Sequence, residues 1–241
     1  MKRPLSLLLS VSLFCSPLLF AVPVVGVAQK AETSAWQQDL EKRRAELSER
    51  NGPGTDTVTR DQLLAMGAQD QDARGIVKGA AKDKSRVQIA TNMREIDASL
   101  TAQLKAIVAA KGWPTIALVG MDASNAAMLV LTHTQDHAWQ LSLLPRLETL
   151  ADQGKIDGSG LAIVIDKELV SEGKLQRYGT QFKAVDGGMA MFGVENPGEL
   201  DAERAKVGLP PMDVYKQQLA AMYHLKATGK VVMASAPVAV Q

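Results

Sequence analysis

Residues 92–111 read NMREIDASLTAQLKAIVAAK, and they form the most regular helical pattern in the chain. Apolar residues recur there at intervals of three, four and one, which places them on one face of a helix. Asn92 suits the N-cap position, and Glu95 three residues later completes a capping box. Gly112 and Pro114 end the pattern, so we predict a helix whose apolar face packs into a core. That face comprises Met93, Ile96, Leu100, Leu104, Ile107 and Val108.

The sequence around this segment indicates further helices and one turn of a different kind. Two short extended runs flank Asp186-Gly187-Gly188, an arrangement that is typical of a β-hairpin. The fold class that we predict is mainly α: a single helical domain with a small β-hairpin near residues 178–195. The other predicted helices lie near residues 122–133, 136–153, 159–172 and 214–223, with a kink or break at Pro145.

The pattern of breaks divides the chain into four predicted parts. Residues 1–28 are a signal peptide, and residues 29–58 are a polar helix and linker that we expect to attach loosely. Residues 59–226 form the helical globular domain, which begins where Thr59 and Gln62 fit a capping box. Residues 227–241 carry no pairing signal and are predicted to be a disordered tail.

The N-terminus has the three parts of a secretory signal. Lys2 and Arg3 provide the positive start, and an apolar run follows over residues 5–25. Gly26-Val27-Ala28 then offers small residues to signal peptidase, so we predict cleavage between Ala28 and Gln29. The alternative is an uncleaved anchor, because the apolar run is close to the ~20 residues that span a bilayer. With cleavage, we expect a periplasmic or secreted protein without an integral membrane span.

Composition excludes several classes of function. The formal net charge is +1 and aromatic residues make up 4% of the chain, which argues against nucleic acid as a partner. The one cysteine, Cys15, lies in the predicted signal. The mature protein would therefore have no disulfide, thiol nucleophile or cysteine metal ligand. No phosphate-binding loop, nucleophile elbow or calcium loop is present, so the sequence predicts no cofactor.

His133 is the first candidate for chemistry. Together with His137 it has the i, i+4 spacing of a zinc site, but no glutamate follows His133 and no third ligand is evident, so we predict no metal. His133 and Asp136 could instead form a catalytic histidine–carboxylate pair for acid–base chemistry. The alternative is a buried histidine that is bonded for structural reasons.

The second candidate is the segment Gln176-Arg177-Tyr178-Gly179-Thr180-Gln181. It offers two amides, a guanidinium, a phenol and a hydroxyl within six residues. Arg177, Tyr178 and Gln181 are therefore candidate ligand-binding residues, and a small polar ligand is the partner that they suggest. The alternative is a turn whose side chains satisfy the ends of helices.

Several short motifs in this order resemble an uncharacterised bacterial family that contains a domain of unknown function. They are Asp70-Gln71 with Arg74, Gly112-Trp113-Pro114, Val119-Gly120 followed by Asn125-Ala126-Ala127, His133, Gln140, Leu144-Pro145, the segment from Gln176 to Phe182, and Leu209-Pro210-Pro211. The resemblance covers about residues 59–224 and implies no activity, ligand or cofactor. It implies that His133, Gln140 and the segment Tyr178–Gln181 belong to one domain and meet in space, and it adds Arg74 and Gln140 to the candidate ligand-binding residues.

Two hypotheses of function follow. The first is a binding or structural module of the cell envelope. The second is a hydrolase-type enzyme in which His133 acts as acid or base, Asp136 or Gln140 orients it, and the segment Gln176–Gln181 holds substrate. Convergence of His133, Arg74, Tyr178 and Gln181 on one pocket would favour an enzyme or a small-ligand site.

Overall fold

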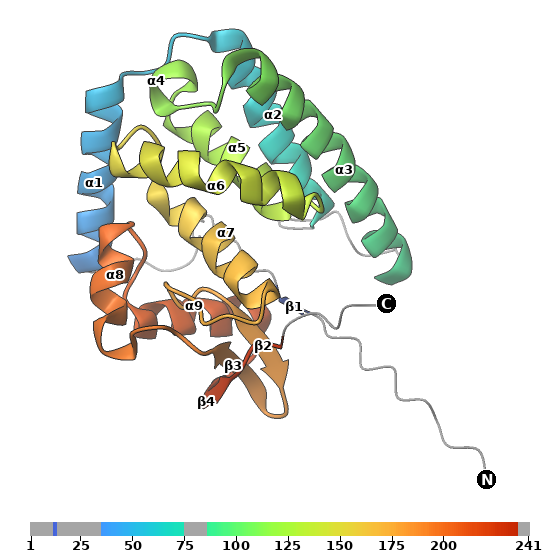
Figure 1. Cartoon of the computed structure of the whole chain (residues 1–241), viewed down its shortest axis with the longest axis vertical. Helices are drawn as coiled ribbons and strands as arrows, with labels where there is room; N and C mark the ends of the chain where they lie inside the picture. The colour runs from blue at the N-terminus through green and yellow to red at the C-terminus, as the bar shows by residue number, and fades with distance from the viewer. Residues whose placement is uncertain (1–11, 14–34, 75–85, 236–241) are drawn as a thin grey trace, which may run out of the picture.

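Helices make up most of the computed structural model, and a small sheet lies toward the C-terminus (Figure 1). The structure describes residues 12–13, 35–74 and 86–235. Because most of the described residues lie in helices, the predicted mainly α class is confirmed. The helices are α1 (Ala35–Asn51), α2 (Thr57–Ala73), α3 (Arg86–Lys111), α4 (Ile116–Val119), α5 (Met121–His133), α6 (His137–Asp152), α7 (Gly158–Ser171), the 3-10 turn η1 (Pro197–Glu199), α8 (Leu200–Lys206) and α9 (Met212–Tyr223). The strands are β1 (Ser12–Leu13), β2 (Phe182–Val185), β3 (Gly188–Phe192) and β4 (Ala227–Val232).

The larger apolar core lies among α2, α3, α5, α6 and α7. The predicted stripe of α3 supplies Leu100, Leu104 and Ile107 to this core, and all three are buried. Helix α5 is apolar on most of its faces and lies at the centre, against α2, α3 and α7. Gly112 ends α3 with φ of 76°, a left-handed conformation that favours glycine.

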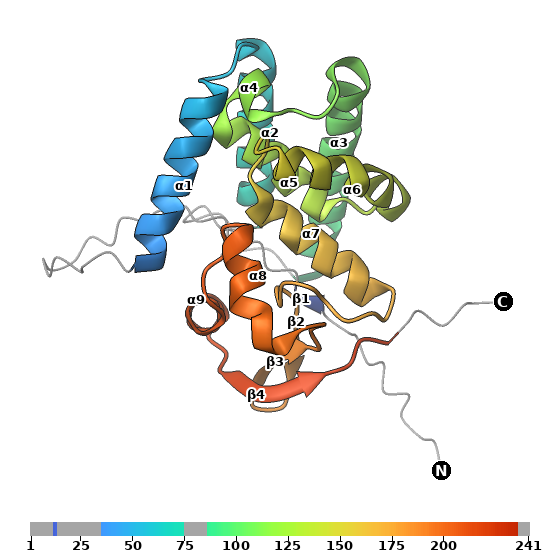
Figure 2. The ribbon, with the colours of Figure 1, turned by 60° about the vertical axis from the view of Figure 1, so that its left-hand side comes forward.

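The smaller core lies below the helical layer, between the sheet and helices α8 and α9 (Figure 2). Strands β2 and β3 form an antiparallel hairpin across the predicted glycine turn, so the hairpin prediction is confirmed. The sheet order is β1-β2-β3-β4, with β4 parallel to β3. The apolar residues of this core are Phe182, Met189, Val194, Leu200, Met212, Tyr215 and Leu219.

The end of the chain differs from the prediction. Residues 227–232, which we assigned to a disordered tail, form strand β4. The backbone of β3 and of the residue after it provides the reason: Met189 N donates to Lys226 O at 2.8 Å, and Gly193 N donates to Val232 O at 2.9 Å. Residues 236–241 lie outside the described residues.

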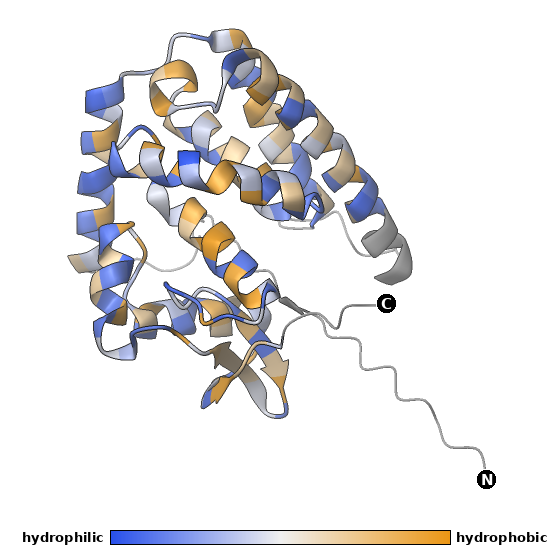
Figure 3. Cartoon of the chain, in the orientation of Figure 1, coloured by the Kyte–Doolittle hydropathy of each residue, from blue (hydrophilic) through white to orange (hydrophobic). Residues whose placement is uncertain are grey.

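Helix α1 is attached more firmly than the sequence suggests. It is hydrophilic along most of its length (Figure 3), but Leu47 is buried. Arg50 Nη2 and Asn51 Nδ2 donate to the carbonyl of Gly154 at 3.1 and 2.9 Å. The expectation of loose attachment is therefore wrong, because these contacts hold the C-terminal end of α1 against the turn between α6 and α7.

Local details of helix ends also differ. Asp56, rather than Thr59, caps α2 by accepting from Thr59 N at 3.0 Å. Asp157, rather than Ser159, caps α7. Helix α6 continues through Pro145, where we expected a kink or break. The predicted cleavage site at Ala28 lies outside the described residues. Among the residues that are described, no helix combines the length and apolar composition that a membrane crossing requires.

Candidate functional site

A chain of charged side chains crosses three helices in the helical layer. His133 ends α5, and its Nδ1 atom lies 2.8 Å from Oδ1 of Asp70 in α2. Arg74 donates to the same oxygen at 2.9 Å and to Oδ1 of Asp97 in α3 at 2.8 Å. Asp70 is fully buried, and the side chains of His133 and Asp97 are each 7% exposed. Each buried carboxylate thus has a cationic or hydrogen-bonding neighbour, which burial of charge requires.

Helix α7 adds two more buried charges. Lys167 Nζ donates to the carbonyl of Thr132 at 2.8 Å. Burial lowers the pKa of Lys167, while the carboxylates of Glu168 and Asp97 act in the opposite direction. Oε1 of Glu168 lies 3.0 Å from Nδ1 of His137, the first residue of α6. The two histidines of the candidate zinc spacing therefore lie on different helices and contact different carboxylates.

Asp136, which we predicted to pair with His133, is used elsewhere. It caps α6, where its Oδ1 accepts from Trp139 N at 3.0 Å. Its other oxygen pairs with Lys105, and that hydrogen bond lowers the pKa of Asp136. The carboxylate that contacts His133 is therefore Asp70, because the helix cap holds Asp136 in another position.

The segment after α7 wraps around the carboxylate of Asp166. Oδ1 of Asp166 accepts from Arg177 N at 2.7 Å and from Tyr178 N at 2.9 Å. Oδ2 accepts from the backbone N and the hydroxyl of Thr180, both at 2.9 Å. Burial raises the pKa of Asp166, and these hydrogen bonds oppose that effect. The polar density of this segment is thus directed at a buried carboxylate of the preceding helix.

The glutamines of the same segment bond to the fold as well. Gln176 accepts from Gln181 N at 2.8 Å and donates to Phe192 O at 2.7 Å, which joins the segment to the hairpin. Gln181 Nε2 donates to the hydroxyl of Thr180 at 3.0 Å. The side chain of Arg177 pairs with Glu148 at 3.1 Å. These hydrogen bonds within the fold agree with the alternative interpretation of this segment, in which its side chains have a structural role.

The candidate residues therefore fall into separate groups. The bonds of His133 and Arg74 lead to Asp70, whereas the segment Gln176–Gln181 surrounds Asp166. Gln140 belongs to neither group. Its side chain is fully buried, and its Nε2 donates to Leu131 O at 2.7 Å. Among the described residues, no cluster of three or more histidine, cysteine, aspartate or glutamate side chains could hold a metal ion.

Several residues of these groups were not predicted as site residues. Asp166, Lys167 and Glu168 stand within LAIVIDKELV, and charges inside such an apolar helix are a signal of buried polar partners. Asp97 gives no comparable signal, because a charged residue on a surface helix is ordinary. Asp70 was part of the family resemblance but was not singled out for chemistry.

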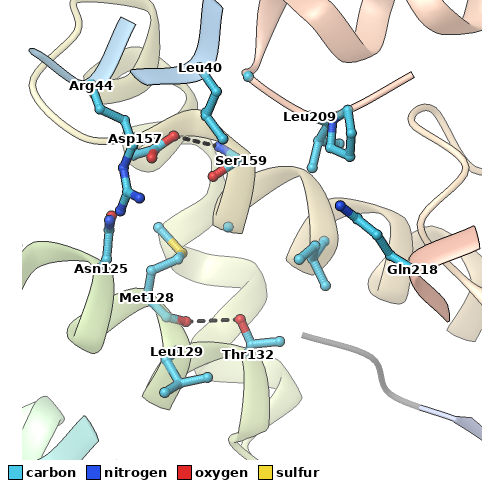
Figure 4. Close-up of a pocket in the computed structure, with 14 residues that line it drawn as sticks. Leu40, Arg44, Asn125, Met128, Leu129, Thr132, Asp157, Ser159, Leu209 and Gln218 are labelled. Carbon is cyan, nitrogen blue, oxygen red and sulfur yellow. Dashed lines mark hydrogen bonds between the residues drawn. The ribbon is translucent and has the colours of Figure 1, made fainter. Parts of the chain in front are cut away.

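A separate cavity of about 60 Å³ lies between α1, α5, α7 and the segment from α8 to α9 (Figure 4). Gly160 is in its wall, and a Cβ there would lie 2.7 Å from Cγ of Met128, so the close approach of α7 to α5 requires glycine. None of the candidate site residues from the sequence lines this cavity. Its apolar lining comprises Leu40, Met128, Leu129, Ile163, Leu209 and Pro210.

Polar side chains from three helices stand around this cavity. Arg44 of α1 and Asn125 of α5 reach toward each other, and Gln218 of α9 points in from another side (Figure 4). All three side chains are partly exposed, and none forms a hydrogen bond or an ion pair with another described residue. Asp157 also lines the cavity, but its Oδ1 accepts from Ser159 N at 3.0 Å. The cavity thus combines an apolar floor with three polar groups that the fold leaves without partners among the described residues.

Comparison with known proteins identifies the domain but not its activity. No curated protein and no solved structure matches the chain. One family model matches residues 57–228. This range includes α2, the hydrogen-bonded groups around Asp70 and Asp166, and the greater part of the cavity lining. The chain therefore belongs to a family of unknown function, DUF6624.

Proposed function

We propose that this chain is a small-molecule-binding module of the cell envelope and that the cavity between α1, α5, α7 and α9 is its binding site. One observation carries the proposal: an apolar cavity is ringed by Arg44, Asn125 and Gln218, which have no partner among the described residues. Sites for small ligands are mostly apolar with a few convergent polar groups. A ligand would move apolar surface out of water and give these polar groups partners.

The volume of the cavity limits the size of the ligand that it can enclose. A volume of about 60 Å³ is well below the ~300–1,000 Å³ of sites for drug-sized molecules. The enclosed part therefore suits a short apolar chain, while the polar end of the ligand would lie among Arg44, Asn125 and Gln218. The envelope location rests on the N-terminal sequence, whose positive start, apolar run and small residues at 26–28 are typical of an export signal.

A tryptophan that fills the cavity provides the test. In the variant Gln218→Trp, the indole would occupy the space into which the glutamine points. We expect 1-pentanol, which has a short apolar chain and one hydroxyl, to shift the NMR signals of Met128, Ile163 and Leu209 in the wild-type protein. We expect these shifts to disappear in Gln218→Trp.

The matched control is Gln217→Trp, which adds the same ring at the neighbouring exposed position of α9. It should leave the pentanol-induced shifts in place. If pentanol shifts the same signals in Gln218→Trp as in the wild type, or shifts only residues outside the cavity, the proposal is wrong.

A hydrolase-type enzyme is the second candidate, and one observation favours it. Asp70 lies 2.8 Å from Nδ1 of His133 and is itself held by Arg74. A carboxylate in this position fixes the orientation of the imidazole ring, as acid–base catalysis requires. We place this candidate second because neither His133 nor Asp70 lines the cavity.

Turnover of p-nitrophenyl acetate separates the two candidates. If His133 is catalytic, the wild-type protein hydrolyses this ester faster than buffer does, and His133→Gln loses most of that rate while keeping its helical circular dichroism. An equal rate in both proteins would reject the enzyme, whereas binding of pentanol would be unaffected by either result.

A further inference from the structure

Two side chains of opposite charge line the cavity, and they differ in their hydrogen bonds. Asp157 and Arg44 both line it, but only the side chain of Asp157 forms a hydrogen bond with another described residue. Its side chain caps α7, a helix of 14 residues, and accepts from Ser159 N at 3.0 Å. The positive end of a helix favours a carboxylate at that position. The guanidinium of Arg44 has no corresponding partner among the described residues, so the charged group that is available to a ligand is positive.

The neighbouring side chains add donors of the same character. Asn125 and Gln218 each carry an amide NH₂ group with two donors. Arginine binds a carboxylate well because its planar fork can donate two parallel hydrogen bonds. A carboxylate held by Arg44 would have further acceptor capacity for these amides. Ammonium groups would meet the like charge of Arg44 instead.

Arg44 comes from outside the region that defines the family. The family model begins at residue 57, whereas α1 spans Ala35–Asn51. Leu47, Arg50 and Asn51 hold the C-terminal end of α1, and its more N-terminal part brings Leu40 and Arg44 to the cavity. The family region supplies the rest of the lining, and α1 adds the positive charge.

On these grounds we infer that the ligand is a short apolar chain that ends in a carboxylate, and that Arg44 is the residue that determines this specificity. The inference rests on the proposed function of the cavity. It also assigns a role in ligand specificity to α1, which lies outside the region that the family model matches.

Three probes of equal chain length test this inference: pentanoate, pentanamide and pentan-1-amine. In the wild-type protein we expect pentanoate to bind more tightly than pentanamide, and pentan-1-amine to bind most weakly. In Arg44→Gln, pentanoate should weaken by about tenfold or more, as loss of a charge-assisted hydrogen bond implies. The affinity for pentanamide should change little, which also shows that the variant is folded. Arg44→Lys should recover part of the affinity for pentanoate, because it keeps the charge but not the planar fork.

Lys42→Gln is the matched control. Its side chain is 76% exposed and lies on the same helix, so it removes one positive charge without touching the cavity. Three results would overturn the role of Arg44 and leave the cavity as a neutral site. They are equal affinities for pentanoate and pentanamide, a higher affinity for the amine, and a loss of pentanoate affinity in Lys42→Gln that equals the loss in Arg44→Gln. Failure of all three probes and of pentanol to bind would reject the proposed function itself.

Discussion

Asp166 and Lys167 are neighbours in α7, and burial affects them in opposite ways. Asp166 faces the segment that follows the helix and accepts hydrogen bonds from it, whereas Lys167 reaches Thr132 at the end of α5. Burial raises the pKa of Asp166 and lowers the pKa of Lys167. Both shifts favour the neutral form of the group. Since the unfolded chain does not bury these residues, the free energy of unfolding should depend on pH through both.

For Lys167 the direction of this dependence is definite. Its pKa in the folded protein lies below the ordinary value of 10.5, so between the two values the unfolded chain binds more protons than the folded chain. Stability contributed by this residue therefore rises with pH in that window. We expect Lys167→Met, which keeps the apolar stem but removes the amine, to gain less free energy of unfolding than the wild type between pH 7 and pH 10. Urea unfolding at both pH values measures this difference.

Lys42→Met serves as the control for Lys167→Met, because it removes an exposed lysine of α1. Its change between pH 7 and pH 10 should follow that of the wild type. If Lys167→Met shows the same gain in stability as the wild type, the amine of Lys167 does not titrate differently in the folded protein.

At the scale of elements, the features that depend on neighbouring residues are the ones that the sequence predicts. The stripe of α3 was predicted correctly because helical period is a property of neighbouring residues. The hairpin was predicted because a glycine turn lies between its two strands. Helix caps were predicted two or three residues late at α2 and α7, because Asp56 and Asp157 compete with nearby threonine and serine for the same role. The predicted cap of α3 is also wrong, because the helix begins at Arg86 and contains Asn92 within it.

Elements and contacts that depend on distant segments could not be predicted in this way. Strand β4 exists because β3 offers it a parallel partner more than thirty residues earlier in the chain, and its own sequence carries little signal. The carboxylate that contacts His133 belongs to Asp70, 63 positions away, whereas the sequence suggested the nearby Asp136. The cavity was missed for the same reason, since Arg44, Asn125 and Gln218 come from three separate helices.

At the scale of the whole molecule, the structure has two apolar cores that a buried arginine connects. Arg204 of α8 is fully buried, and its Nε donates to Pro210 O at 2.7 Å. Its Nη1 donates to the carbonyl of Tyr178, a residue of the larger core, at 2.6 Å. The guanidinium also lies 4.6 Å from the ring centre of Tyr215, which belongs to the smaller core. Arg204 thus contacts residues of both cores at once.

Replacing this arginine should separate the unfolding of the two cores. Arg204→Met fills similar space but removes both hydrogen bonds to carbonyls, and leaving buried acceptors unpaired costs about 1–3 kcal/mol each. All three tryptophans, Trp36, Trp113 and Trp139, lie outside the sheet region, so their fluorescence reports on the helical layer. In the variant we expect the amides of β2–β4 and α9 to lose their protection from hydrogen exchange at a lower urea concentration than the one at which tryptophan fluorescence changes.

In the wild type, and in the control Lys206→Met on the exposed side of α8, the two transitions should coincide. Coinciding transitions in Arg204→Met would show that apolar contacts alone couple the two cores.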